Sequence, residues 1–377
     1  MIDLQDCRRE IDKIDKQIVE LFQRRMQVCE QVAEYKIHTG KPVLDSEREK
    51  NKLECLEAQA EGDFNRLGVQ EIFQQIMAIS RKRQYQLLTE NGIPHRTDYE
   101  FVDALPMNGA RVVFQGVEGA YSYAAMREYF GGDEITSFHV KTWRDAMDAI
   151  VAKKADYAVL PIENSTAGTV ADIYDLLAEY QLFIVGEQFL RIKHVLLGVP
   201  GASKSDVTKV YSHPQALAQC SPYLRQHPQW ETFEAVNTAG SAKKVAEEGL
   251  VCQAAIASRE AGRLFGLEVL DEDICSNGEN FTRFIILGRE PVYEKGSHKV
   301  SICFELPHET GTLYNMLSHI IYNGLNMTKI ESRPIPGRNW EYRFFVDFEG
   351  NLEEAAVVNA IRGITQEANS CRILGNY

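Results

Sequence analysis

The sequence predicts a multidomain protein with an all-α region, a two-lobed α/β region and an α+β region, in that order. Up to about residue 88, apolar residues recur at helical spacing and Pro42 is the sole proline. From 110 to about 288, short apolar runs alternate with helical stretches, which is typical of α/β proteins with a largely parallel sheet. From 298 on, the pattern predicts β-α-β-β-α-β, the ferredoxin-like plan.

The first region is expected to form one long helix over about 4–38 and two further helices over about 45–60 and 67–87. At 1.5 Å per residue the first helix is about 50 Å long, which is too long for a globule of this size. We therefore expect it to pack against a partner chain. A break follows at Gly40-Lys41-Pro42.

Residues 89–109 are polar and predict a linker between the domains 1–88 and 110–288. In the second domain the expected strands are Arg111–Gln115, Tyr157–Pro161, Leu182–Val185, Lys209–Ser212 and Ala254–Ser258. Its expected helices lie near 141–153, 168–179, 214–226 and 238–248. The last domain, 298–377, is expected to hold strands near 300–306, 327–332, 342–348 and 372–374, with helices near 313–321 and 352–361.

Composition narrows the classes of function. The formal net charge of −13 argues against a nucleic-acid or anionic-membrane partner, although a local cluster of cations can still bind a small anion. The first residues lack the apolar stretch of a signal peptide, and the eight cysteines form no Cys-x-x-Cys pair, so a cytoplasmic protein without disulfides or zinc is expected. No glycine-rich nucleotide motif indicates a cofactor, and none is expected.

Several basic residues of the first region lie beside its apolar stripe. Arg25 and Lys36 are eleven residues apart and share a helix face, whereas Arg8 points about 100° away and could reach only a pocket of a symmetry mate. These residues could belong to a solvated charged helix. Alternatively, they could line a bundle core that binds a small dianion and accelerates a pericyclic rearrangement by holding the reactive shape.

The stretch from Arg8 through Lys41-Pro-Val-x-Asp-x-Glu-Arg-Glu49 to Ser80-x-x-x-Gln84 resembles the all-helical chorismate mutases, which form an intertwined dimer. The resemblance implies that Arg25, Lys36 and Arg48 bind the carboxylates and ether oxygen of chorismate. It also implies that the partner chain donates Arg8. Asp45 and Glu49 would hold the substrate hydroxyl, and Ser80 and Gln84 would complete the pocket, with Gln84 at the ether oxygen.

In the α/β region, glycines and hydroxyl residues gather where strands lead into helices, in 116–122, 161–168, 212–215 and 237–242. Each segment alone reads as ordinary helix capping. Together they point to an anion-binding crevice at a switch in strand order.

These segments, with Asn280-Phe-Thr-Arg-Phe284, resemble prephenate dehydratase over about 110–288. The resemblance implies two lobes like those of a periplasmic binding protein, with crossings near 190 and 272. It also implies loss of water and carbon dioxide from prephenate to give phenylpyruvate. The implied site residues are Glu163, Asn164, Ser212, Gln215 and Thr282, with Ser122, Ser165, Thr166, Thr238 and Arg283 as supports. Thr282 would be a placed hydrogen-bond donor at the leaving hydroxyl.

Strand alternation puts Thr282 and Arg283 on opposite faces. Arg283 is then either a support behind the site, paired with a carboxylate, or an anchor to a neighbouring loop; the sequence does not choose.

Residues 298–377 resemble an ACT domain, an amino-acid-sensing module. The implied L-phenylalanine site lies at a dimer interface and comprises Gly311, Thr312, Leu313, Tyr314, Glu331, Ser332, Arg333 and Pro334. The family commonly has smaller residues at the positions of Thr312 and Tyr314.

Taken together, the three regions resemble the bifunctional chorismate mutase–prephenate dehydratase family. This resemblance implies a homodimer or tetramer that acts on chorismate and prephenate and is inhibited by L-phenylalanine. Two rivals are a solute-binding or sensor protein, which would bind ligand without turnover, and a protein with one inactive domain.

Overall fold

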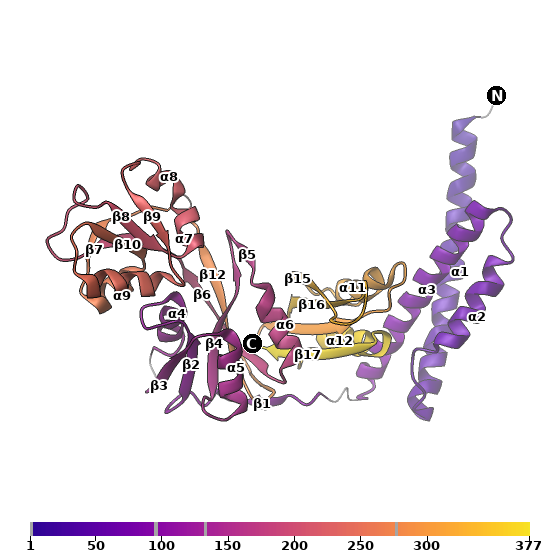
Figure 1. Cartoon of the computed structure of the whole chain (residues 1–377). Helices are drawn as coiled ribbons and strands as arrows, with labels where there is room; N and C mark the ends of the chain where they lie inside the picture. Colours follow the sequence, from indigo (N-terminus) through magenta and orange to yellow (C-terminus); the bar gives the residue numbers. More distant parts are fainter. Residues whose placement is uncertain (1–2, 94–96, 132–133, 276–277) are drawn as a thin grey trace. The chain divides into compact units, whose positions relative to one another are not determined.

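A computed structural model describes residues 3–93, 97–131, 134–275 and 278–377 (Figure 1). Contacts between residues divide the chain into two compact units. Unit 1 comprises Met1–Thr97 and Ile302–Arg372, and unit 2 comprises Asp98–Ser301 and Ile373–Tyr377. The domain boundaries drawn from the sequence stay predictions, because the helical region and most of the last region fall in one unit.

Unit 1 begins with three helices, α1 (Leu4–Thr39), α2 (Ser46–Glu57) and α3 (Asp63–Glu90). The Asp3 side chain caps α1, and Gly40 ends it in the left-handed conformation that glycine adopts without strain, with φ of 69°. The expected long helix is therefore confirmed. Helix α3 starts four residues earlier than expected, directly after Gly62.

The apolar stripe of α1 is largely uncovered in the single chain. Among the described residues of this helix, Ala33 alone is buried, whereas Ile11 and Ile18 are more than half exposed. Stripes of this width normally face a core, so the stripe lacks a partner surface within the chain.

The rest of unit 1 contains the helices α11 (Thr312–Tyr322) and α12 (Ala355–Glu367) and the strands β15 (Met327–Pro334) and β16 (Tyr342–Glu349). Strands β14 (Lys299–Glu305) and β17 (Ser370–Asn376) complete this region, with the spatial order β15-β16-β14-β17. The β-α-β-β-α-β order predicted from the sequence is confirmed. Helices α11 and α12 both contact α3.

Unit 2 contains two sheets. In the first, β6 (Phe183–Arg191), β12 (Phe281–Gly288), β4 (Tyr157–Asn164), β2 (Arg111–Gln115) and β3 (Thr136–Val140) lie side by side in that order, and β5 (Gly168–Thr169) pairs with β4. Helices α4 (Tyr121–Tyr129), α5 (Trp143–Val151) and α6 (Ala171–Glu179) contact these strands. Side chains from β2, β4, β12 and α4, including Phe114, Phe284 and Met126, form its core.

The second sheet has the order β11-β7-β10-β8-β9. Its strands are β7 (Val195–Gly198), β8 (Lys209–Ser212), β9 (Glu231–Glu234), β10 (Gln253–Ala257) and β11 (Glu268–Asp271), and its helices are α7 (Pro214–Gln219), α8 (Ser221–Leu224), α9 (Thr238–Glu248) and α10 (Arg259–Phe265). Alternation along β7 sends Leu197 into a core with α9 and α10, and Leu196 into a core with α7 and Trp230. Helices therefore cover both faces.

The expectation of largely parallel sheets is wrong in part. Strand β2 is parallel to β3 and β4, and β8 is parallel to β9 and β10. However, β12 runs antiparallel to both β4 and β6, and β7 runs antiparallel to β10 and β11. The chain leaves the first sheet after β6 and returns to it as β12, and apolar spacing carries no information about the direction of that return.

The expected linker is also partly regular structure. Helix α3 continues to Glu90, and β1 (Glu100–Val102) pairs in parallel with β13 (Val292–Glu294). Within the expected linker, residues 94–96 lie outside the described residues.

Candidate functional sites

Four polar side chains of unit 2 form a closed hydrogen-bonded ring. Asn164 donates to Asn280 Oδ1 (2.7 Å), and Asn280 donates to Gln219 Oε1 (3.1 Å). Gln219 in turn donates to Thr166 Oγ1 (3.0 Å), which donates back to Asn164 Oδ1 (2.7 Å). Because every member both donates and accepts, the bonds polarise one another and fix the orientation of the amides. We call these residues the amide ring.

The amide ring holds Thr282. Asn164 and Thr282 lie opposite each other on β4 and β12, and Asn164 Nδ2 donates to Thr282 Oγ1 over 2.8 Å. Thr282 is buried. Since its oxygen accepts from Asn164, its hydroxyl hydrogen can still be donated.

His194 extends the ring toward Tyr121. Its Nε2 lies 3.0 Å from Gln219 Oε1, and its Nδ1 lies 2.8 Å from Tyr121 Oη. Burial lowers the pKa of His194 to about 4, although the hydrogen bond with Gln219 acts in the opposite direction. The imidazole of His194 is therefore neutral at pH 7. The Gln219 carbonyl oxygen can only accept, so a proton on Nε2 suits that contact, while the Tyr121 hydroxyl beside Nδ1 donates to the Lys193 carbonyl oxygen (2.9 Å).

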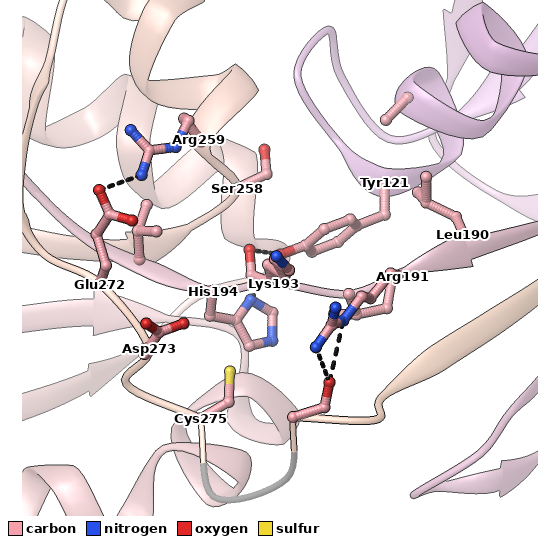
Figure 2. A pocket seen from close by; sticks show the side chains of 14 residues that line it. Tyr121, Leu190, Arg191, Lys193, His194, Ser258, Arg259, Glu272, Asp273 and Cys275 are labelled. Carbon is pink, nitrogen blue, oxygen red and sulfur yellow. Dashed lines mark hydrogen bonds and ion pairs between the residues drawn. The ribbon is translucent and has the colours of Figure 1, made fainter.

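A cavity of about 370 Å³ adjoins this histidine (Figure 2). It is lined by Tyr121 and by two segments where the chain passes between the sheets. The first is 190–195, which includes His194, and the second contributes Glu272, Asp273, Cys275 and Gly278. Cations also line it: Arg191 donates to the Gly278 carbonyl oxygen, and Arg259 pairs with Glu272. Of the hydrogen-bonded network, Tyr121 and His194 line this space of ligand size, whereas Thr282 and the amide-ring residues are not among its lining residues.

Arg283 lies on the opposite face of β12 from Thr282 and is buried. Its Nε lies 2.7 Å from Glu187 Oε2, and its Nη2 donates to Tyr377 Oη over 2.8 Å. Lys299 pairs with the same carboxylate. Arg283 is thus paired with a carboxylate, as one of the two alternatives expects, and its role as a support of the site stays a prediction.

The other expected residues of this region are not members of the amide ring. Ser212 is buried and donates to the Ile256 carbonyl oxygen (2.6 Å), and Ser122 donates to the Gln115 carbonyl oxygen (2.5 Å). Gln215 is exposed on the first turn of α7. Glu163 lies opposite Arg283 in the sheet, and Ser165 accepts from the Phe281 N–H. Thr238 is the first residue of α9.

Sequence reasoning missed Gln219. It lies four residues after Gln215 on α7, so both glutamines share a helix face. The spacing was a usable signal, but it could not show that only the second glutamine reaches Asn280.

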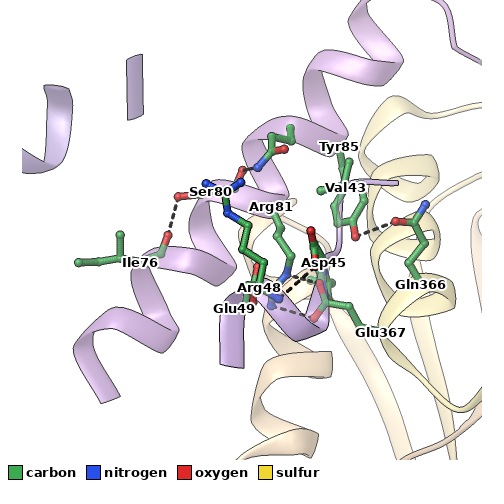
Figure 3. Close-up of polar contacts among 12 residues, drawn as sticks. Val43, Asp45, Arg48, Glu49, Ile76, Ser80, Arg81, Tyr85, Gln366 and Glu367 are labelled. Atoms are coloured by element: carbon green, nitrogen blue, oxygen red, sulfur yellow. Dashed lines mark hydrogen bonds and ion pairs between the residues drawn. The ribbon is translucent and has the colours of Figure 1, made fainter. Parts of the chain in front are cut away.

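Helices α1, α2 and α3 bring several of the expected mutase residues together, and Figure 3 shows four of them, Asp45, Arg48, Glu49 and Ser80. Arg25 Nη1 donates to Ser80 Oγ (2.5 Å), and Lys36 Nζ donates to the Val43 carbonyl oxygen (2.6 Å). Burial lowers the pKa of Lys36, while the charges of Asp45 and Glu49 oppose this shift. The pocket therefore joins cations from α1 to residues of α2 and α3.

Residues of α2 and α3 complete this cluster. Asp45 caps α2 by accepting from the Arg48 N–H (3.1 Å), and Glu49 Oε2 lies 2.5 Å from Arg81 Nη1. Gln84 is buried and donates to the Ser80 carbonyl oxygen (3.2 Å), and its Oε1 has no hydrogen-bond donor among the described residues. Arg8 is exposed. An unpaired buried acceptor marks a place that a ligand or a second chain can complete.

Comparison with known proteins gives the family. Residues 7–85 match the type II chorismate mutase family and residues 112–292 match the prephenate dehydratase family. The chain is 32% identical over 375 residues to the bifunctional chorismate mutase/prephenate dehydratase of Escherichia coli K12, covering 98% of this chain and 95% of the relative. It belongs to the bifunctional chorismate mutase/prephenate dehydratase family.

Two solved structures are similar to about 70% of the chain. One is a prephenate dehydratase from Arthrobacter aurescens in complex with L-Phe, with a TM-score of 0.66, 31% identity, and coverage of 71% of this chain and 89% of that one. The other, described as a quorum-quenching acylase, GqqA, has a TM-score of 0.65 and 34% identity, and the match covers 70% of this chain and 96% of that one.

In this bifunctional chain, the expected regulatory residues lie at two places in unit 1. Gly311 adopts the left-handed conformation (φ 82°) before α11, where Thr312 donates to the Glu309 carbonyl oxygen (3.0 Å) and Tyr314 is exposed. Glu331, Ser332, Arg333 and Pro334 form the end of β15, which stands at the edge of its sheet. Leu313 is half-buried.

Within the described part of the chain, no helix is long and apolar enough to cross a membrane. The same residues include no group of three or more His, Cys, Asp or Glu side chains that could hold a metal ion.

The Arg283 contacts predict a stability effect. Arg283→Met should lower the free energy of unfolding of unit 2 by about 1–3 kcal/mol, because Glu187 loses a buried partner but keeps Lys299. Calorimetric melting of the full chain measures this. Arg191→Met, an exposed arginine on β6, is the control and should have the smaller effect. Equal shifts would contradict the role assigned to Arg283.

Proposed function

We propose that the chain rearranges chorismate to prephenate in its helical region and converts prephenate to phenylpyruvate in its α/β region. L-Phenylalanine binds the C-terminal module and lowers the second activity. The main support is that some expected side chains meet in each region: Asn164 bonds Thr282 in the α/β region, and Arg25 bonds Ser80 in the helical region. The proposed compartment is the cytoplasm, in keeping with cysteines that are all free thiols.

For the mutase step, Arg25, Lys36 and Arg48 are assigned to the two carboxylates and the ether oxygen of chorismate. Gln84 gives one amide hydrogen to Ser80, so a second is available for the ether oxygen. Holding the flexible substrate in its reactive shape and stabilising charge on the breaking C–O bond requires no nucleophile.

We propose that a second copy of the chain covers the apolar stripe of α1 in an intertwined dimer. The exposed stripe of α1 supports this, because an apolar face of such length is otherwise left in water. In that arrangement Arg8 of the second copy enters the pocket of the first. A tetramer is compatible with the same contact.

For the dehydratase step, the Thr282 hydroxyl is assigned to the leaving hydroxyl of prephenate. The ring C–O bond breaks and hydroxide leaves with its electron pair, then takes up a proton to become water. The C–C bond to the ring carboxylate breaks, carbon dioxide leaves, and the electron pair enters the ring, which becomes aromatic. A threonine is a poor acid, so Thr282 acts as a donor held in place by Asn164.

The two activities should be separable by mutation. Purified protein should convert chorismate to phenylpyruvate without an added cofactor. Thr282→Ala should lower dehydratase kcat by about 100-fold or more, as expected for loss of one placed donor, and leave the mutase unchanged. Thr282→Ser keeps the hydroxyl and should retain much of the activity. Prephenate binding without turnover would instead indicate a solute-binding protein.

Arg48→Ala should abolish the mutase activity and spare the dehydratase, since the two sites use different residues. The matched control is Lys50→Ala, an exposed cation on the same helix, which should leave both activities intact. Absorbance assays with chorismate and with prephenate measure the steps independently. Equal loss of both activities in Arg48→Ala would contradict separate sites.

L-Phenylalanine should bind the full chain in calorimetry and inhibit the dehydratase. Substitution of Ser332 or Arg333 by alanine should weaken both effects, because these residues belong to the proposed site. Thr328→Ala, on the same strand outside the 331–334 motif, is the control. Absence of heat of binding in the wild type would refute a phenylalanine site in this chain.

A further inference from the structure

Arg81 joins the proposed mutase site to helix α12. It follows Ser80 on α3 and is 7% exposed. Its Nη1 contacts Glu49 Oε2 (2.5 Å), while its Nε and Nη2 contact Glu367 Oε1 (2.7 Å) and Oε2 (3.0 Å) in a two-point pair. Figure 3 shows Arg81 in contact with both carboxylates. A guanidinium suits this position, because its planar fork can bind two carboxylates at fixed angles.

The charges of this group are balanced locally. Burial alone would lower the pKa of Arg81, but the Glu367 and Glu49 carboxylates raise it above its usual range. Burial alone would raise the pKa of Glu367, but the His319 hydrogen bond and the Arg81 charge hold it at about 2. Arg81 and Glu367 are therefore both charged and hydrogen-bonded at neutral pH, and removal of either one leaves the other as a buried charge without its partner.

Glu367 is itself held by the helices of the C-terminal module. His319 Nε2 on α11 lies 3.2 Å from Glu367 Oε1. Nearby, Tyr85 donates to Gln366 Oε1 (3.0 Å) and Thr89 donates to Asn359 Oδ1 (2.6 Å), so α3 and α12 are joined at three successive turns of α3. The position of Arg81 is thus fixed from the side of α12.

We propose that Arg81 is a positioning residue of the mutase, which fixes the Glu49 carboxylate through its tie to Glu367 on α12. The proposal rests on the proposed mutase site, in which Glu49 holds the substrate hydroxyl. Arg81 occupies Oε2 of Glu49 and leaves Oε1 to accept from that hydroxyl. A residue of the C-terminal module therefore sets the geometry of a carboxylate in the helical region.

The test compares Arg81→Gln, Glu367→Gln and the control Arg83→Gln in the full chain. Arg83 lies one half-turn further along α3 and pairs with Glu30 (2.8 Å) and Glu90 (3.1 Å), not with Glu49. Arg81→Gln and Glu367→Gln should each lower mutase kcat/KM by about 10-fold or more, since small displacements in a site are costly. The loss should lie mainly in KM for chorismate, because the hydroxyl contact exists in ground and transition states alike. Dehydratase activity and Arg83→Gln should be unaffected.

A double-mutant comparison separates positioning from general stability. In a Glu49→Gln background, Glu367→Gln should cause no further loss of mutase kcat/KM, because the group that it positions has already been altered. An equal loss in both backgrounds, a similar loss in Arg83→Gln, or unchanged kinetics in Glu367→Gln would each overturn the proposal. Absence of mutase activity in the wild-type chain would instead refute the proposed function on which it rests.

Discussion

The pairing of β12 with a strand on each side is the constraint on which the α/β region depends. A strand held on both edges cannot shift, so its alternate side chains are assigned to fixed faces. Thr282 is thereby placed against Asn164, and Arg283 against Glu187. A slip by one residue would exchange a hydroxyl and a guanidinium between a polar ring and an ion pair.

The partner strand β4 contains an irregularity next to the site. Arg283 pairs with Glu163 and the next residue, Phe284, pairs with Pro161, so β4 carries one extra residue there. Proline has no N–H to donate to the hydrogen-bond ladder. It is tolerated in a central strand at a bulge because the ladder is interrupted there. The bulge also bends the strand just before Asn164, which is where the amide ring begins.

The two sites use different electrostatic arrangements. The amide ring holds Thr282 through neutral side chains, and the adjoining His194 is also neutral, so no ionised group takes part in this network. The helical pocket instead contains the cations Arg25 and Lys36, and a further cation, Arg81, contacts Glu49. This difference agrees with the reactions proposed: one must place a weak donor, and the other must hold charges in a fixed shape.

Sequence reasoning found features set by local pattern and missed those set by distant contacts. Helical spacing of apolar residues predicted both ends of α1 to within one residue. Alternation of apolar and polar residues predicted the strands of the β-α-β-β-α-β order. The antiparallel return of β12 had no local signal. Nor had the tie between Arg81 and Glu367, which are 286 residues apart. Stability alone does not account for that tie, because burying ions costs about as much as their attraction returns. What the two-point pair does supply is orientation, which is what a carboxylate needs when it must meet a single substrate hydroxyl.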